Sequence, residues 1–142
     1  MKTETLLHSA EFTTETRSNA VLDVLDWFVN LHPDHVSSEV WLECQTALIE
    51  GFDNAVRHAH KHLPVETPIR VNISIYQRAV AIQIWDQGHP IGFDALLQQT
   101  PETVKLTAES GRGLMLMRRV ADYLAYTRNN HNQNCLLVIR VL

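Results

Sequence analysis

A carboxylate and a carboxamide lie one helical turn apart in the segment Glu50-Gly51-Phe52-Asp53-Asn54. On a helix, residues i, i+4 and i+8 share one face, so Glu50, Asn54 and His58 would form a polar stripe. An amide oxygen is a hard ligand of the kind that Mg²⁺ takes together with phosphate oxygens and water. A carboxylate can accept the proton of an attacking hydroxyl group or water. The spacing is typical of a magnesium–phosphate site, although a solvated helix face would show the same stripe.

A second candidate lies at the end of an expected strand, in Trp85-Asp86-Gln87-Gly88. An aspartate that leaves an apolar strand into a glycine turn can present its carboxylate to an exocyclic amine, such as that of adenine. Gly88 has no side chain, so the backbone there can approach a ligand closely. A simple Asx turn, which Asp-x-Gly sequences often form, explains the same residues without a ligand.

A third candidate is the segment Ser110-Gly111-Arg112-Gly113-Leu114, directly before an expected helix. Small residues leave backbone N–H groups accessible at a helix N-terminus, where phosphate binds well. Arg112 adds a charged donor. A flexible hinge that contains glycine would show the same residues, so this segment is weak evidence when taken alone.

Apolar periodicity predicts the helices and strands that must position these residues. From Ile69 to Ile75, for example, apolar and polar residues alternate as in a strand with one buried face. The expected strands are Leu6–Thr13, Ile69–Ile75, Ala79–Trp85, Leu124–Arg128 and Cys135–Val141, and the expected helices are Asn19–Leu31, 38–62 and Leu114–Asp122. Between them, 86–110 is mostly irregular, with a short helix at Phe93–Gln99. Helices on one face of a mixed, mostly antiparallel sheet give an α+β fold, a two-layer α/β sandwich.

The composition indicates one soluble domain that spans residues 1–142. Hydrophobic residues make up 45% and charged residues 20%, values ordinary for a globular protein. The net charge of −4 predicts no nucleic-acid partner. Cys44 and Cys135 lie far apart, which argues against a disulfide framework or a cysteine-rich zinc site. Neither a signal peptide nor an apolar run long enough to span a membrane is visible, so we expect a cytoplasmic protein with no membrane partner.

Taken together, the three segments resemble the N, G1 and G2 boxes of the GHKL ATPases. They occur in that order, each in the expected structural setting, and the match spans about Leu48 to Leu124. Within this superfamily, the phrases ALIEGFDNAVRHAH, WDQGHPIGFD and SGRGLMLMRRVADYLAYTR are similar to those of the anti-sigma-factor serine/threonine-protein kinases. The resemblance implies a Bergerat (GHKL ATPase) fold that binds ATP with Mg²⁺.

The resemblance also implies roles for individual residues. Glu50 would be the general base, Asn54 the Mg²⁺ ligand, and Asp86 the acceptor for the adenine amino group. Residues 92–110 would be a mobile lid over ATP. The residues that would bind the nucleotide and its metal are Asn54, Asp86, Gly88, Gly111, Arg112, Gly113 and Leu114.

Members of this kinase family phosphorylate a serine of a STAS-domain anti-sigma-factor antagonist and alternately bind a sigma factor or another regulated protein. They are commonly homodimers, and the apolar first strand and helix predict where two copies would meet; the residues concerned are Leu6, Leu7, Phe12, Trp27 and Phe28. A module that binds ATP and a partner without phosphate transfer is the main alternative. A sensor histidine kinase is disfavoured because that group typically lacks glutamate at the position of Glu50, and a water-using ATPase because no transducer domain is seen.

Two departures from the family pattern concern adenine recognition. Pro90 stands where many members of the superfamily have glycine, and Asn134-Cys135 stands where a threonine often assists the adenine aspartate. Three histidines, His58, His60 and His62, cluster at the end of the long predicted helix. Favourable placement of histidine near a helix C-terminus explains them better than a zinc site.

Overall fold

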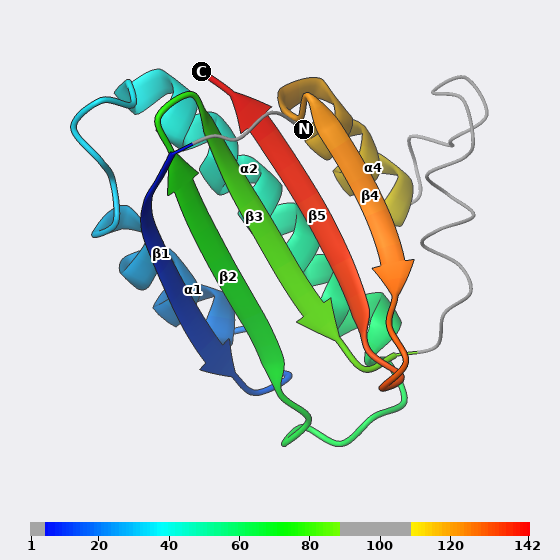
Figure 1. Cartoon of the computed structure of the whole chain (residues 1–142). Coiled ribbons are helices and arrows are strands. Elements are labelled where there is room, and N and C mark those ends of the chain that lie inside the picture. The colour runs from blue at the N-terminus through cyan, green and yellow to red at the C-terminus, as the bar shows by residue number, and fades with distance from the viewer. Residues whose placement is uncertain (1–4, 89–108) are drawn as a thin grey trace.

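The computed structural model describes residues 5–88 and 109–142, which form one layer of strands and one layer of helices (Figure 1). The strands are β1 (Leu6–Thr14), β2 (Ile69–Tyr76), β3 (Ala79–Asp86), β4 (Tyr123–Arg128) and β5 (Asn134–Val141). The helices are α1 (Ala20–Val29), α2 (Ser38–Asn54), the π-helix η1 (Ala55–Ala59) and α4 (Glu109–Val120). Pro90, the predicted short helix Phe93–Gln99 and nearly all of the predicted lid lie outside the described residues.

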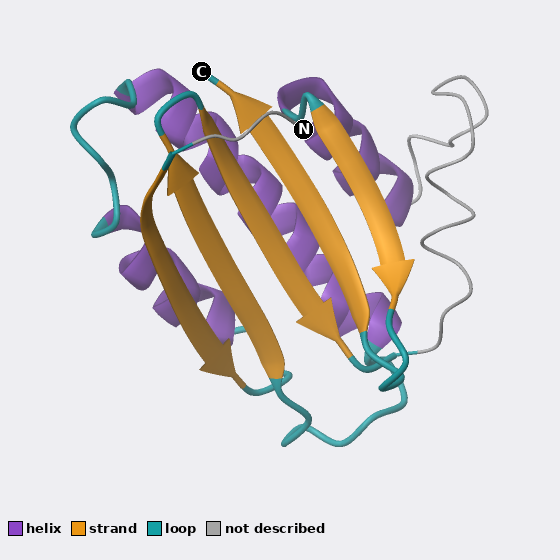
Figure 2. Cartoon of the chain, viewed as in Figure 1, coloured by secondary structure: helices purple, strands orange, loops and turns teal. Residues whose placement is uncertain are grey.

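The five strands form one sheet in the order β1-β2-β3-β5-β4. Every pairing between these strands is antiparallel, so the described part of the sheet contains no parallel pair, whereas the sequence predicted a mixed sheet. The helices all cover the same face of the sheet (Figure 2). This arrangement confirms the predicted two-layer α+β fold.

The core lies between the helices and the inner face of the sheet. Alternate residues of β2 are buried, as the sequence pattern predicts. Gly51 lets α2 approach the sheet closely, because a Cβ atom there would lie 2.5 Å from Cδ1 of Ile84 and 2.9 Å from Cδ2 of Leu136. The apolar faces of the helices are used in this packing, and within the described residues none of the helices has both the length and the apolar character needed to cross a membrane.

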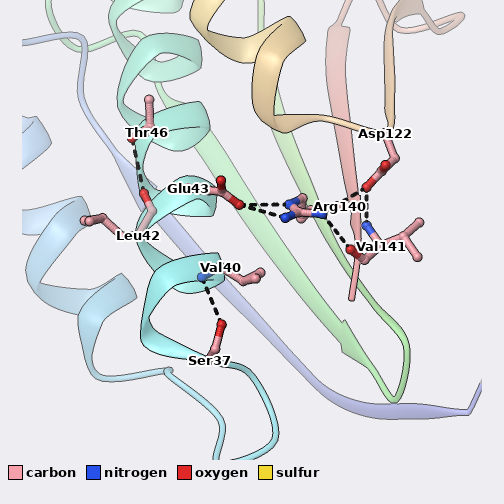
Figure 3. Close-up of polar contacts among 8 residues, drawn as sticks. All are labelled: Ser37, Val40, Leu42, Glu43, Thr46, Asp122, Arg140 and Val141. Carbon is pink, nitrogen blue, oxygen red and sulfur yellow. Dashed lines mark hydrogen bonds and ion pairs between the residues drawn. The ribbon is translucent and has the colours of Figure 1, made fainter.

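The long helix begins as predicted but changes geometry before its predicted end. The Ser37 hydroxyl accepts a hydrogen bond from the backbone N–H of Val40 and caps α2 (Figure 3). After Asn54 the chain continues as the π-helix η1, and the N–H of His60 bonds to the carbonyl oxygen of Ala55 at 2.8 Å. A π-turn is wider than an α-turn and shifts the side chains that follow. The predicted polar stripe therefore does not continue: Asn54 is buried and His58 is exposed.

The glycine-rich segment lies inside α4 and not before it, which corrects the predicted start of this helix at Leu114. The helix begins at Glu109, so Gly111 and Arg112 occupy its first turn and Gly113 is its fifth residue. The first four N–H groups of a helix have no partner within it. Gly111 and Arg112 keep such groups, whereas Gly113 does not.

The apolar N-terminal region is largely used inside the domain. Phe28 is fully buried, and its ring stacks on that of Trp41 with centroids 4.2 Å apart. The rings of Phe12 and Trp27 lie 5.3 Å apart. Of the residues that the sequence assigned to a dimer interface, Phe28 therefore belongs to the core.

An ionic cluster joins α2 to the last strand of the chain (Figure 3). Nε and Nη2 of Arg140 donate to the same Glu43 oxygen at 3.2 and 2.7 Å. Nη1 of Arg140 lies 3.5 Å from a carboxylate oxygen of Asp122, which also accepts from the N–H of Val141. The hydrogen bond to Glu43 is the main reason that the pKa of Arg140 is raised. Arg140 thus connects the helical layer to the connection between α4 and β4.

We expect the Arg140–Glu43 pair to contribute about 0.5–1 kcal/mol to stability, because both side chains are only partly exposed and the bonds are short. A double-mutant cycle with Arg140→Met and Glu43→Gln, measured by urea unfolding, would give this coupling energy. The more exposed pair Arg17–Glu15 is the control and should couple less. A coupling energy of zero for Arg140–Glu43, or one that does not fall at high salt, would contradict this role.

Candidate functional site

The carboxylate of Asp86 is buried at the end of β3 and is held by three donors. Its Oδ1 atom accepts from the N–H of Gly88 at 2.9 Å and from Nδ2 of Asn134 at 2.8 Å. Its Oδ2 atom accepts from the hydroxyl of Tyr126 at 2.9 Å. A carboxylate has about four acceptor positions. These bonds leave Oδ2 with capacity for one more donor, as an exocyclic amine would supply.

The sheet places these donors through its register. Asn134 pairs with Asp86 across β3 and β5, and Arg128 pairs with Asn134 across β5 and β4. Nη1 of Arg128 donates to Oδ1 of Asn134 at 3.0 Å and to the carbonyl oxygen of Gly88 at 3.2 Å. Nδ2 of Asn134 also donates to that carbonyl oxygen, at 2.9 Å. The row Asp86–Asn134–Arg128 therefore fixes both the carboxylate and the turn that follows it.

These supporting residues carry little signal in the sequence. Asn134 departs from the family's threonine pattern, but its amide donates directly to Asp86. Tyr126 and Arg128 were not singled out at all. Their only signal was position: Tyr126 and Arg128 are the fourth and sixth residues of β4, and they face the same side of the strand as Leu124.

Gly88 lies against the end of η1, where a side chain would not fit. A Cβ atom at this position would clash with the backbone carbonyl of Ala59, with the carbonyl carbon only 2.7 Å away. The glycine is therefore needed for the close packing of the turn on the helix, in addition to the predicted approach to a ligand.

Glu50 and Asn54 lie on the predicted long helix, at the end of α2, and α2 packs against α4. Asn54 is 6% exposed, and its Nδ2 atom has no hydrogen-bond partner among the described residues. Glu50 is partly buried, and its Oε1 atom lies so close to Gly113 that a Cβ atom there would be 2.6 Å away. Burial, with a smaller effect from Asp53, raises the pKa of the Glu50 carboxyl. The structure thus brings together the first and third candidate segments.

A small pocket opens beside Glu50, between α1 and α2. Its volume is about 100 Å³. The residues that line it are Ser18, Val21, Ile49, Glu50, Phe52, Asp53 and Val56. Glu50 is therefore one of the residues that line this pocket, while its Oε1 atom lies against Gly113.

A family model described as a histidine kinase-like ATPase domain matches residues 13–140. The chain belongs to the histidine kinase-like ATPase family. No curated protein matches the chain. The matched range runs from the end of β1 to β5, so it contains every described residue of the candidate site.

The residues of this histidine kinase-like ATPase domain fit ATP, the ligand of the family. Asp86 has acceptor capacity left for an amine donor, and it lies at the end of the sheet. Nδ2 of Asn54 is buried and has no partner among the described residues, and such a donor is rare unless a ligand, for example a phosphate oxygen, or water accepts from it. The side chains of Arg112 and Leu114 lie outside the described residues, so their predicted contacts with phosphate stay predictions.

We expect Gly88→Ala to destabilise this histidine kinase-like ATPase domain by about 1–3 kcal/mol, because the added methyl group clashes with backbone that cannot move aside cheaply. Thermal unfolding without nucleotide would measure the effect. Gln87→Ala is the matched control, since Gln87 is adjacent and its side chain is exposed. Equal melting temperatures for Gly88→Ala and Gln87→Ala would rule out the proposed contact.

Proposed function

We propose that this chain is a magnesium- and ATP-dependent protein-serine kinase of the anti-sigma-factor type. The observation that carries the proposal is the pair formed by Glu50 and Asn54. The carboxyl group of Glu50 has a raised pKa and lies against Gly113 of α4. One helical turn later, Asn54 carries a buried amide nitrogen that has no partner among the described residues. A module that only binds ATP needs the amide but has no use for such a base.

The role proposed for each residue follows from its position in the site. Asp86 accepts a hydrogen bond from the adenine amino group through Oδ2, and Asn134 and Tyr126 keep its carboxylate in place. Asn54 holds Mg²⁺ through its amide oxygen. When bound, the magnesium ion supplies positive charge that offsets the negative charge of the phosphate oxygens.

Glu50 acts as the general base in this proposal. The serine oxygen forms a bond to the terminal phosphorus while the bond from that phosphorus to the bridging oxygen breaks, and the serine proton moves to Glu50. A base works best when its pKa approaches the working pH. Burial moves the pKa of Glu50 in that direction, and Asp53 adds to the effect.

The proposed substrate is a serine on a STAS-domain anti-sigma-factor antagonist, with a sigma factor or another regulated protein as the alternate partner. The pocket beside Glu50 supports the approach of a protein segment from the side of α1 and α2. A homodimer through the N-terminal region is also proposed. It is supported by Leu6 and Leu7, which are 51% and 50% exposed on the edge strand β1.

We expect Glu50→Gln to reduce phosphate transfer to the antagonist serine by roughly 10²-fold or more, since a positioned base typically contributes 10²–10⁴-fold. ATP affinity should stay nearly the same, because Glu50 touches neither adenine nor the metal in this proposal. Transfer from labelled ATP and calorimetry would measure the two quantities. Asn54→Ala should differ by losing magnesium-dependent binding and transfer together.

The matched control for Glu50→Gln is Glu39→Gln, at an exposed position in the first turn of α2. If Glu50→Gln transfers phosphate as fast as the control, the base is another group. If the wild-type protein binds ATP and a partner but transfers no phosphate, the binding-only function is correct.

We expect Asp86→Asn to weaken ATP binding by about 1.5–3 kcal/mol, because it removes a charged acceptor for the amine. Calorimetry in the presence of magnesium would measure this. The exposed Asp34 provides the control, and Asp34→Asn should leave the affinity unchanged. Equal ATP affinities of Asp86→Asn and the wild type would exclude Asp86 from adenine binding.

A further inference from the structure

His60 is buried directly behind the turn that carries Asp86. It is 1% exposed, and both ring nitrogens have partners. Nδ1 lies 2.8 Å from Oγ1 of Thr16, and Nε2 lies 2.8 Å from the backbone nitrogen of Gln87. Oγ1 of Thr16 also donates to the carbonyl oxygen of Thr67 at 2.6 Å. In the sequence, His60 is one of three histidines near a predicted helix end and has no separate predicted role.

These bonds determine which nitrogen of His60 carries the proton. The single hydroxyl hydrogen of Thr16 goes to Thr67, so the Thr16 oxygen must accept from Nδ1–H of His60. The Gln87 N–H can only donate, so Nε2 must be unprotonated and accept. His60 is therefore a neutral ring with its hydrogen on Nδ1.

The surroundings of His60 favour this neutral form. Burial lowers the pKa of His60, and the nearby Asp86 carboxylate opposes this only in part. Thr16 and Thr67 carry no charge. The acceptor at Nε2 is thus maintained near neutral pH, where the ring would otherwise begin to take up a proton.

The hydrogen bond from Gln87 reaches the centre of the Asp86 turn. Gln87 stands between Asp86, whose carboxylate is held from the β5 side, and Gly88, which packs on Ala59. His60 holds the same turn through the N–H of Gln87. A shift of the Gln87 backbone would carry the Asp86 side chain with it, because the two residues share a peptide bond.

We propose that His60 is a positioning residue for adenine binding: it accepts the Gln87 N–H and so fixes the direction in which Asp86 presents its carboxylate. The inference rests on the proposed role of Asp86 in binding the adenine amino group. According to this inference, His60 affects the selectivity for adenine over other nucleobases, in addition to the stability of the fold, although it does not touch the nucleotide.

The test compares ATP with ITP, in which an oxygen replaces the exocyclic amine. His60→Phe fills the space of the ring but offers no acceptor to Gln87. We expect it to lower ATP affinity roughly 10-fold, since the partly buried N–H of Gln87 loses its acceptor and the turn moves. ITP affinity should fall much less, so the preference for ATP over ITP shrinks. Calorimetry with the magnesium salts of both nucleotides measures the ratio.

Two further variants keep the test decisive if His60→Phe folds poorly. His60→Gln places a side-chain oxygen near the position of Nε2 and should restore most of the preference for ATP. Thr16→Val leaves the ring in place but removes the acceptor for Nδ1–H. It should reduce the preference for ATP over ITP roughly 3-fold, which is less than the effect expected when the bond from Gln87 is lost. His62→Gln, at an exposed position two residues away, is the matched control and should behave as wild type.

The outcomes separate this inference from the proposed function. If His60→Phe and Thr16→Val lower ATP and ITP affinity equally, or leave both unchanged, His60 does not position Asp86, while ATP binding stands. If the wild-type protein binds ATP no better than ITP, Asp86 has no role at the adenine amine, and both the assignment of Asp86 and this inference are overturned. Selective loss of ATP affinity with rescue by glutamine supports the inference.

Discussion

The carboxylate of Asp86 is buried at the end of a central strand, and a buried charge is tolerated only where hydrogen bonds replace the lost water. Much of the surrounding structure satisfies this one requirement. The register of β3 against β5 brings the Asn134 amide to Oδ1, and the edge strand β4 brings the Tyr126 hydroxyl to Oδ2. Arg128 in turn holds the Asn134 oxygen. A shift of one residue in the register of β3 with β5, or of β5 with β4, would turn the Asn134 or Tyr126 side chain to the other face of the sheet. The carboxylate would then lose those partners.

The helix α2 must satisfy two demands at once. It packs tightly on the sheet, which Gly51 permits, and it carries Glu50 and Asn54 at its end. The change to π-geometry begins directly after Asn54. Because the wider turn rotates the residues that follow, His58 lies at the surface and His60 lies in the interior. The same segment therefore places Asn54 at the proposed metal and phosphate site and places His60 against the turn that carries Asp86.

The fold was largely predictable because its signals are local. Alternation marks strands such as β2, and Ser37 marks the start of α2. The order of the three candidate segments was also readable from the sequence. The supporting residues were not, because Asn134 acquires its role only through cross-strand register, which no local pattern specifies. His60 was missed because an α-helical period was assumed across a segment that is a π-helix.

The start of α4 shows a further limit of local rules. Gly111 and Gly113 suggested a loop, yet the helix begins before them at Glu109. Glycine disfavours a helix interior by only about 1 kcal/mol per residue, which tertiary packing can override. Here the packing supplies a reason for glycine: the Glu50 carboxylate lies where a side chain of residue 113 would be.

The continuous segment from Glu50 to His60 therefore connects chemically distinct parts of the site. Glu50 is the proposed base, Asn54 one helical turn later is the proposed metal ligand, and His60 at the end of the segment holds the Asp86 turn through Gln87. A displacement of this segment along its axis would move the base against Gly113 and pull on the Asp86 turn at the same time. The proposed base, the proposed metal ligand and the support of the Asp86 turn therefore lie on one short stretch of chain, although Asp86 itself lies on β3.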